Sequence, residues 1–80
     1  MKIPRDVSAT ELIKRLAVFG YIVSRQTGSH IRITTLQKGQ HHLTIPNHDP
    51  IKIGTLSSIL SDIAQHFSIT KEELIRKIWG

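Results

Sequence analysis

The sequence predicts a single α+β domain, residues 1–80, in which helices cover one face of a three-stranded antiparallel sheet. Apolar residues recur at helical spacing near both ends of the chain, whereas the middle alternates polar and apolar residues with the period of a strand. Short glycine-containing turns separate the alternating segments and leave no room for a helical crossover, so neighbouring strands should run antiparallel. The expected order of elements is αβββαα.

The first helix is expected to begin after Ser8 and to end near Phe19. Ser8 and Glu11 have the spacing of a capping box, in which each side chain bonds the backbone N–H of the other residue. Gly20 follows, and glycine readily adopts the left-handed conformation that commonly ends a helix. The apolar residues between these points form a stripe at helical spacing; they are Leu12, Ile13, Leu16, Ala17 and Phe19.

Three strands are expected over residues 21–26, 30–34 and 41–45. A turn at Thr27-Gly28 joins the first two, and Pro46 ends the third because proline has no N–H for the ladder. Period-2 alternation gives this sheet an apolar face, which the helices must cover, and an open polar face. The open face should carry His30, Arg32, His42 and Thr44.

Two further helices follow the strands. Gly54-Thr55 is expected to start the second helix, whose apolar stripe runs from Leu56 to Phe67. The third begins with another capping box, Thr70 with Glu73. Trp79, near the end of this helix, is either a core residue or a contact for a partner protein or a second copy, and both interpretations remain open.

Charge narrows the classes of function. Eleven Lys and Arg residues against six Asp and Glu give a formal net charge of +5. The stretch between Leu12 and His48 has no acid and holds Lys14, Arg15, Arg25, Arg32 and Lys38. This excess indicates a polyanionic partner, with nucleic acid favoured over a membrane surface. Because the chain has no cysteine and no apolar run that could span a bilayer, we expect a cytoplasmic monomer or small homo-oligomer without a cofactor.

Histidine is a common metal ligand, so the histidines of this chain could indicate a metal site. His41 and His42 are neighbours on a strand, and neighbouring strand residues point to opposite faces, so they do not easily ligate one ion. We therefore expect no metal site and interpret His41, His42 and His48 as surface or RNA-contacting residues. His42 shares the expected face of His30, where it could complete an acid–base pair.

Three spaced segments carry a family pattern: Gly20-Tyr-x-Val-x-Arg-Gln-x-Gly-Ser-His30, Leu43-Thr-Ile-Pro-Asn-His48 and Lys52-Ile-Gly-Thr-Leu-Ser-Ser-Ile-Leu60. From Ser8 to Ile78 the chain resembles the HicA toxin family of bacterial toxin–antitoxin modules. The resemblance implies a fold similar to the double-stranded RNA-binding domain, endoribonuclease activity on mRNA, and a HicB antitoxin that covers the site. It also implies that His30, at the head of the second strand, is catalytic.

The chemistry expected at this site is metal-independent cleavage of RNA. The 2′-hydroxyl can attack the adjacent phosphate if one group removes its proton and another protonates the leaving 5′-oxygen; a histidine with a pKa near 6.5 suits either role. Nearby cations stabilise the added charge on the phosphate, and the free N–H groups that open the second helix favour an anion. The candidates for RNA contact are Arg25, Ser29, Arg32, His42 and Lys52.

Two other functions remain open on the residues alone. A non-catalytic RNA-binding module of double-stranded RNA-binding-like fold would bind RNA with an affinity that falls steeply with salt and would leave the RNA uncut. The lysine cluster typical of such domains is absent, which counts against recognition of long duplex RNA. A pure protein-interaction domain would show neither cleavage nor RNA affinity.

Overall fold

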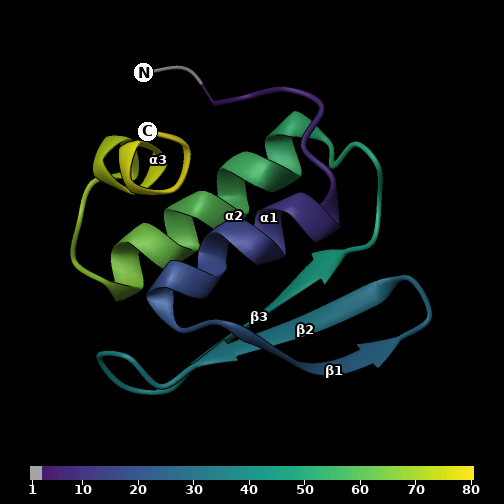
Figure 1. Ribbon diagram of the computed structural model, residues 1–80, viewed down its shortest axis with the longest axis horizontal. Helices are drawn as coiled ribbons and strands as arrows, with labels where there is room; N and C mark the ends of the chain where they lie inside the picture. Colours follow the sequence, from purple (N-terminus) through teal and green to yellow (C-terminus); the bar gives the residue numbers. More distant parts are fainter. Residues whose placement is uncertain (1–2) are drawn as a thin grey trace.

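The computed structural model describes residues 3–80 and has the predicted order of elements (Figure 1). The elements are α1 (Ala9–Leu16), the 3-10 helix η1 (Ala17–Phe19), β1 (Ile22–Thr27), β2 (His30–Thr35), β3 (His41–Pro46), α2 (Ile53–His66) and α3 (Lys71–Trp79). The strands form one antiparallel sheet in the order β1-β2-β3. The α+β class and the αβββαα order are therefore confirmed.

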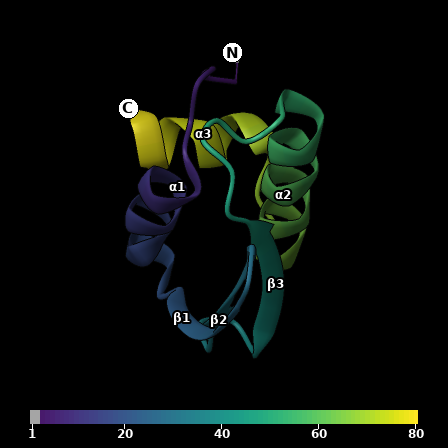
Figure 2. The same cartoon turned by 90° about the vertical axis from the view of Figure 1, so that its right-hand side faces the viewer.

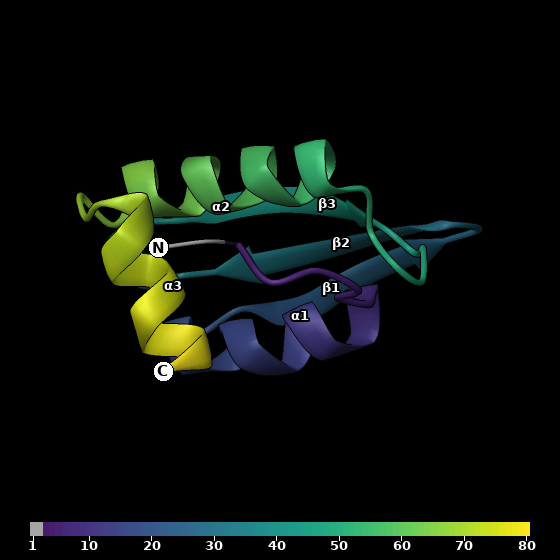
Figure 3. The same cartoon turned by 90° about the horizontal axis from the view of Figure 1, so that it is seen from above.

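All helices lie on one face of the sheet, and the other face is open (Figure 2). Helices α1 and α2 pack over the strands, and α3 crosses both of them at one end (Figure 3). Alternation along β2 and β3 points every second side chain toward the helices. The sheet thus contributes Ile31, Ile33, Leu43 and Ile45 to the core, and all four are buried. The residues between them, of opposite parity, remain on the open face.

Helix α1 ends and begins in ways that differ slightly from expectation. Gly20 has the expected left-handed φ of 82°, but the turn before it is 3-10 rather than α-helical. At the start, Ser8 Oγ accepts a hydrogen bond from the N–H of Glu11 at 3.1 Å. The Glu11 carboxylate does not return the bond, because it accepts instead from Arg15 at 3.0 Å and from Trp79 at 3.4 Å. The reciprocal capping box predicted at Ser8 is therefore wrong.

Helix α3 is anchored to α1 by its last residues. Arg15 donates to the carbonyl of Ile78 at 2.6 Å, and its guanidinium lies 5.6 Å from the ring centroid of Trp79. Trp79 is partly buried against the core, which favours the structural interpretation of this residue. The second predicted capping box is complete, with bonds of 3.0 and 3.1 Å between Thr70 and Glu73.

Strand β1 contains a bulge that decides which way Arg25 points. Val23 pairs with Ile33 and Arg25 pairs with Arg32, so Ser24 is the extra residue between them. Strict alternation from Val23 would turn Arg25 toward the helices, whereas the bulge puts it on the open face opposite Arg32. All six residues of β1 are exposed, so the strand is an open edge of the sheet.

Candidate functional site

His30 begins β2 directly after a two-residue turn formed by Gly28 and Ser29. Thr27 and His30 pair across this turn, and Gly28 has a φ of 54°, which glycine adopts at little cost. The carbonyl of Ser29 accepts a hydrogen bond from the N–H of Asn47 at 2.7 Å, which ties the turn to the end of β3. The backbone under His30 is thus held from both neighbouring strands, while its side chain is exposed.

Two arginines face each other beside His30. Arg25 on β1 and Arg32 on β2 are register partners, and both are exposed. Arg32 is two residues, or ~7 Å, along the strand from His30. Like charges directly opposite on a sheet destabilise it, and within residues 3–80 neither guanidinium forms an ion pair. Because a guanidinium presents a planar fork of donors to phosphate, this pair is suited to hold an anion.

His42 shares the open face with His30, as predicted, but it is not a neighbour. It pairs with Thr34, which is four residues, or ~13 Å, along β2 from His30. The Nδ1 atom of His42 lies 2.8 Å from Thr34 Oγ1, and that hydroxyl lies 2.8 Å from the Oγ of Ser24. These bonds connect all three strands and fix the imidazole. An acid–base pair of His30 with His42 at one phosphate does not fit this geometry.

Lys52 lies at the same end of the molecule as His30. It is the exposed N-cap residue of α2, and no side chain caps the first turn of that helix. Both α1 and α2 begin at this end, on the right of Figure 1, where the turn between β1 and β2 also lies. The positively polarised N-termini of two helices therefore lie toward the part of the sheet that carries His30.

The opposite end of the sheet holds a second group of polar side chains, which face the helices. The hydroxyl of Tyr21 lies 2.6 Å from Nδ1 of His41, and Nε2 of His41 lies 3.3 Å from the Asp62 carboxylate. The ring of His66 stacks on His41 with centroids 4.4 Å apart, and its Nε2 lies 2.9 Å from the carbonyl of Gln37. Burial, reinforced by the charge of Asp62, raises the pKa of Tyr21. The interpretation of His41 as a surface or RNA-contacting residue is therefore wrong.

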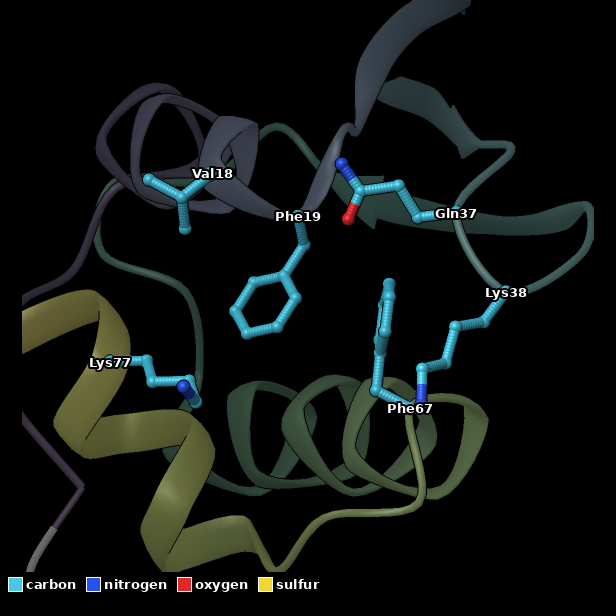
Figure 4. Close-up of a pocket in the computed structure, with 6 residues that line it drawn as sticks. All are labelled: Val18, Phe19, Gln37, Lys38, Phe67 and Lys77. Atoms are coloured by element: carbon cyan, nitrogen blue, oxygen red, sulfur yellow. The ribbon is translucent and has the colours of Figure 1, made fainter.

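A cavity of about 400 Å³ lies at this same end (Figure 4). The rings of Phe19 and Phe67 form its floor, with centroids 4.8 Å apart, and Lys38 and Lys77 extend to it from opposite sides. It lies where η1 and α2 end, and the negative polarity of helix C-termini disfavours an anionic ligand. The two lysines are better explained as complements to these helix ends, so we exclude this cavity from the candidate site.

Within residues 3–80, no three histidine, cysteine or acidic side chains are grouped so that they could hold a metal ion. Over the same residues, none of the helices combines the length and the apolar character that crossing a membrane requires. Neither finding changes the candidate site, which consists of the exposed His30, the facing Arg25 and Arg32, the turn residue Ser29, and Lys52 at the start of α2.

Comparison with protein families gives a match over most of the chain. Residues 9–64 match the family described as HicA toxin of bacterial toxin-antitoxin. The chain belongs to the HicA toxin family. The matched residues run from α1 through most of α2 and include every residue of the candidate site. Membership in a HicA toxin–antitoxin family implies an antitoxin partner. Neither curated protein sequences nor solved structures yield a significant match.

Proposed function

We propose that this HicA family member is an endoribonuclease that cleaves mRNA without a metal ion, with His30 as a catalytic acid or base. The observation that supports this most is the setting of His30. Its exposed ring stands at the head of β2 beside two facing arginines, and within residues 3–80 no protein group bonds to it. A ring without a protein partner keeps both nitrogens available to donate a proton to a ligand or to accept one from it.

In the proposed reaction, the 2′-hydroxyl of one nucleotide attacks the adjacent phosphorus, and the bond from phosphorus to the 5′-oxygen of the next nucleotide breaks. The products are a 2′,3′-cyclic phosphate and a free 5′-hydroxyl. A base takes the proton of the 2′-hydroxyl, an acid protonates the 5′-oxygen, and His30 performs one of these two transfers. Arg25 and Arg32 stabilise the extra negative charge that builds up on the phosphate oxygens.

The remaining proposed contacts hold the RNA on either side of the scissile phosphate. Ser29 lies in the turn next to His30, and Lys52 adds a charge beside the free N–H groups of α2. His42, ~13 Å along the open face, would contact a neighbouring nucleotide rather than the scissile one. We further propose that a HicB-like antitoxin covers this face in the cytoplasm and so blocks access of mRNA.

The proposed function is tested by inducing the wild-type protein and the His30→Ala variant in growing cells. Wild-type protein should arrest growth and deplete mRNA, whereas the variant should do neither, although it should match the wild type in circular dichroism and urea midpoint. Purified wild-type protein should cut labelled RNA in the presence of EDTA and leave 2′,3′-cyclic phosphate ends. Arrest by a folded His30→Ala protein would refute catalysis by His30.

The same purified protein separates this proposal from a non-catalytic RNA-binding module. A module of that kind would retain RNA with a salt-dependent affinity and leave it intact. The antitoxin is tested by coexpressing the product of the open reading frame next to this gene. Growth should recover, and the two proteins should copurify; continued arrest with both proteins present would exclude that product as the antitoxin.

A further inference from the structure

The proposed cleavage requires a proton acceptor and a proton donor at the same phosphate, and one imidazole can be in only one of these states when the substrate binds. His30 therefore leaves one role unfilled. His42 lies ~13 Å away along the sheet and is held by Thr34 and the strand that carries it. The missing group should lie closer to the turn that precedes His30.

The five histidines of the chain fall into two groups by their hydrogen bonds. In His41, His42 and His66, a ring nitrogen bonds to a protein group. For His30 and His48, no such bond is formed within the described part of the chain, and both residues are exposed. An imidazole without a protein partner keeps both nitrogens available to a ligand.

The backbone places His48 next to the turn of His30. The register pairs His30 with Pro46, and the bond from the N–H of Asn47 to the carbonyl of Ser29 extends this ladder by one more rung. His48 is the next residue, two positions after the partner of His30, whereas His42 lies four positions before that partner. The backbone of His48 therefore lies closer to that of His30 than the backbone of His42 does.

The loop that carries His48 is held in place by further backbone bonds. The N–H of His48 donates to the carbonyl of Pro46 at 2.8 Å, and its own carbonyl accepts from the N–H of Ala9 at 3.3 Å. Three residues later, the N–H of Ile51 donates to the carbonyl of Val7 at 2.8 Å. The position of His48 is thus fixed against the start of α1.

We propose that His48 is the second proton-transfer residue of the reaction and acts on the same phosphate as His30. This inference rests on the proposed ribonuclease function. One imidazole enters neutral and takes the proton of the 2′-hydroxyl, while the other enters protonated and gives its proton to the 5′-oxygen as the bond to phosphorus breaks. The two rings end with exchanged protonation states, and proton exchange with water restores them.

The dependence of the cleavage rate on pH provides the first test, with wild type, His30→Ala and His48→Gln. The wild-type profile should be bell-shaped, and each variant should lose one limb of the bell and ~10²-fold or more in rate. Charged residues of the segments next to His48 can shift the limbs but are kept in all proteins; they are Arg5, Asp6, Lys14, Asp49 and Lys52.

The matched control is His66→Gln, which removes an imidazole from the opposite end of the molecule and should keep both limbs and the wild-type rate. Circular dichroism should show the same fold for all four proteins, the urea midpoint of His30→Ala and His48→Gln should match that of the wild type, and all rates are compared per folded molecule. RNA with a 2′-deoxy nucleotide at the scissile position binds without being cut, and its Kd should be unchanged in His48→Gln. A wild-type profile in His48→Gln, or a defect confined to this Kd, would overturn the proposal.

A sulfur substrate assigns the two roles. In this RNA, sulfur replaces the 5′-oxygen of the scissile bond, at a site first mapped with the wild-type enzyme. A thiolate leaves without being protonated, so the variant that lacks the acid should regain rate while the variant that lacks the base should not. Rescue of one variant alone supports the pair, and rescue of neither overturns it. If the wild type cuts neither RNA, the proposed ribonuclease function itself fails.

Discussion

The two ends of the sheet use histidine in opposite ways. At the end where β2 turns into β3, both ring nitrogens of His41 are bonded to protein and its ring stacks on His66. At the other end, His30 and His48 are exposed, and the described residues offer their rings no hydrogen bond. A bonded histidine is part of the fold, whereas a well-positioned histidine without a partner is available for chemistry.

Charge divides the molecule in the same way. Near His30, Arg25 faces Arg32, and two helices begin. At the opposite end, the Asp62 carboxylate accompanies His41, and α2 ends. Within residues 3–80, the two facing arginines form no ion pair with a carboxylate, whereas His41 at the other end has Asp62 beside it.

The largest difference between the two ends should appear in the rate of RNA cleavage. His30→Gln should lower the rate by ~10²- to 10⁴-fold, because it removes the proposed proton-transfer group. His41→Gln should keep the wild-type rate per folded molecule, because its ring serves the core. Single-turnover cleavage at saturating protein, corrected for the folded fraction by circular dichroism, measures both. A cleavage loss in fully folded His41→Gln equal to that of His30→Gln would erase the distinction.

The free energy of unfolding should fall more when His41 is replaced than when His30 is replaced, the reverse of the order expected for the cleavage rate. His41→Ala leaves the hydroxyl of Tyr21, a residue only 2% exposed, without its partner. An unpaired buried hydroxyl costs about 1–3 kcal/mol in the free energy of unfolding, and a domain of this size loses about 4–8 °C in Tm per kcal/mol. His30→Ala should change the free energy by no more than ~0.5 kcal/mol. Urea titration measures the free energy of unfolding of both variants. Equal losses would contradict the assignment of His41 alone to the fold.

If the facing arginines Arg25 and Arg32 contact phosphate, replacing one of them should weaken the salt dependence of RNA binding. Arg32→Gln should reduce the slope of log K against log salt by ~0.7, the value for one phosphate contact on a single strand. The fold should be unaffected or gain ~0.2–1 kcal/mol, since a repulsive cross-strand pair is removed. Lys77→Gln makes the same change of charge at the other end and should leave the slope unchanged. A slope altered equally by both substitutions would indicate a diffuse charge effect.

The smallest effect should be a pH dependence in alkali. Burial and Asp62 raise the pKa of Tyr21 above its ordinary value, so the folded state holds this proton more tightly than the unfolded chain does. That contribution is fully present below the ordinary tyrosine pKa near 10 and decreases as the pH rises above it. Tyr21→Phe should flatten this part of the stability curve. Because Tyr21 is the chain's single tyrosine, tyrosinate absorbance reports its ionisation directly.

Much of this arrangement was predictable from the sequence, because alternation along β2 and β3 is regular. The same parity that put His30 and Arg32 on the open face also put His41 with Leu43 on the helix side, so the internal position of His41 had a signal. What covers a strand residue depends on helices distant in the sequence. The bonds of His41 to Tyr21 and Asp62 therefore required the packed structure.

The candidate site was predictable only in part, for a physical reason. The sequence placed His30 at the head of a strand, but register fixes which residues lie opposite each other, and register is set by turns and bulges. Only the pairing shows that His42 lies four residues from His30, and only a backbone bond of Asn47 brings His48 near. The capping box at Ser8 failed because Arg15, one helical turn on, and Trp79, from a distant helix, both donate to the Glu11 carboxylate.

The bulge at Ser24 makes the two halves of β1 independent units. Counted back from the turn, Arg25 must face Arg32; counted forward from Tyr21, Val23 must face the helices. In a regular strand Val23 and Arg25, two residues apart, would share a face, so the two requirements conflict unless Ser24 bulges out of the ladder. Because Ser24 absorbs the mismatch, Arg25 reaches the open face while Tyr21, just before the strand, stays buried. Deletion of Ser24 should therefore leave Val23 opposite Ile33 and Arg25 opposite Arg32, with the bulge removed from the strand.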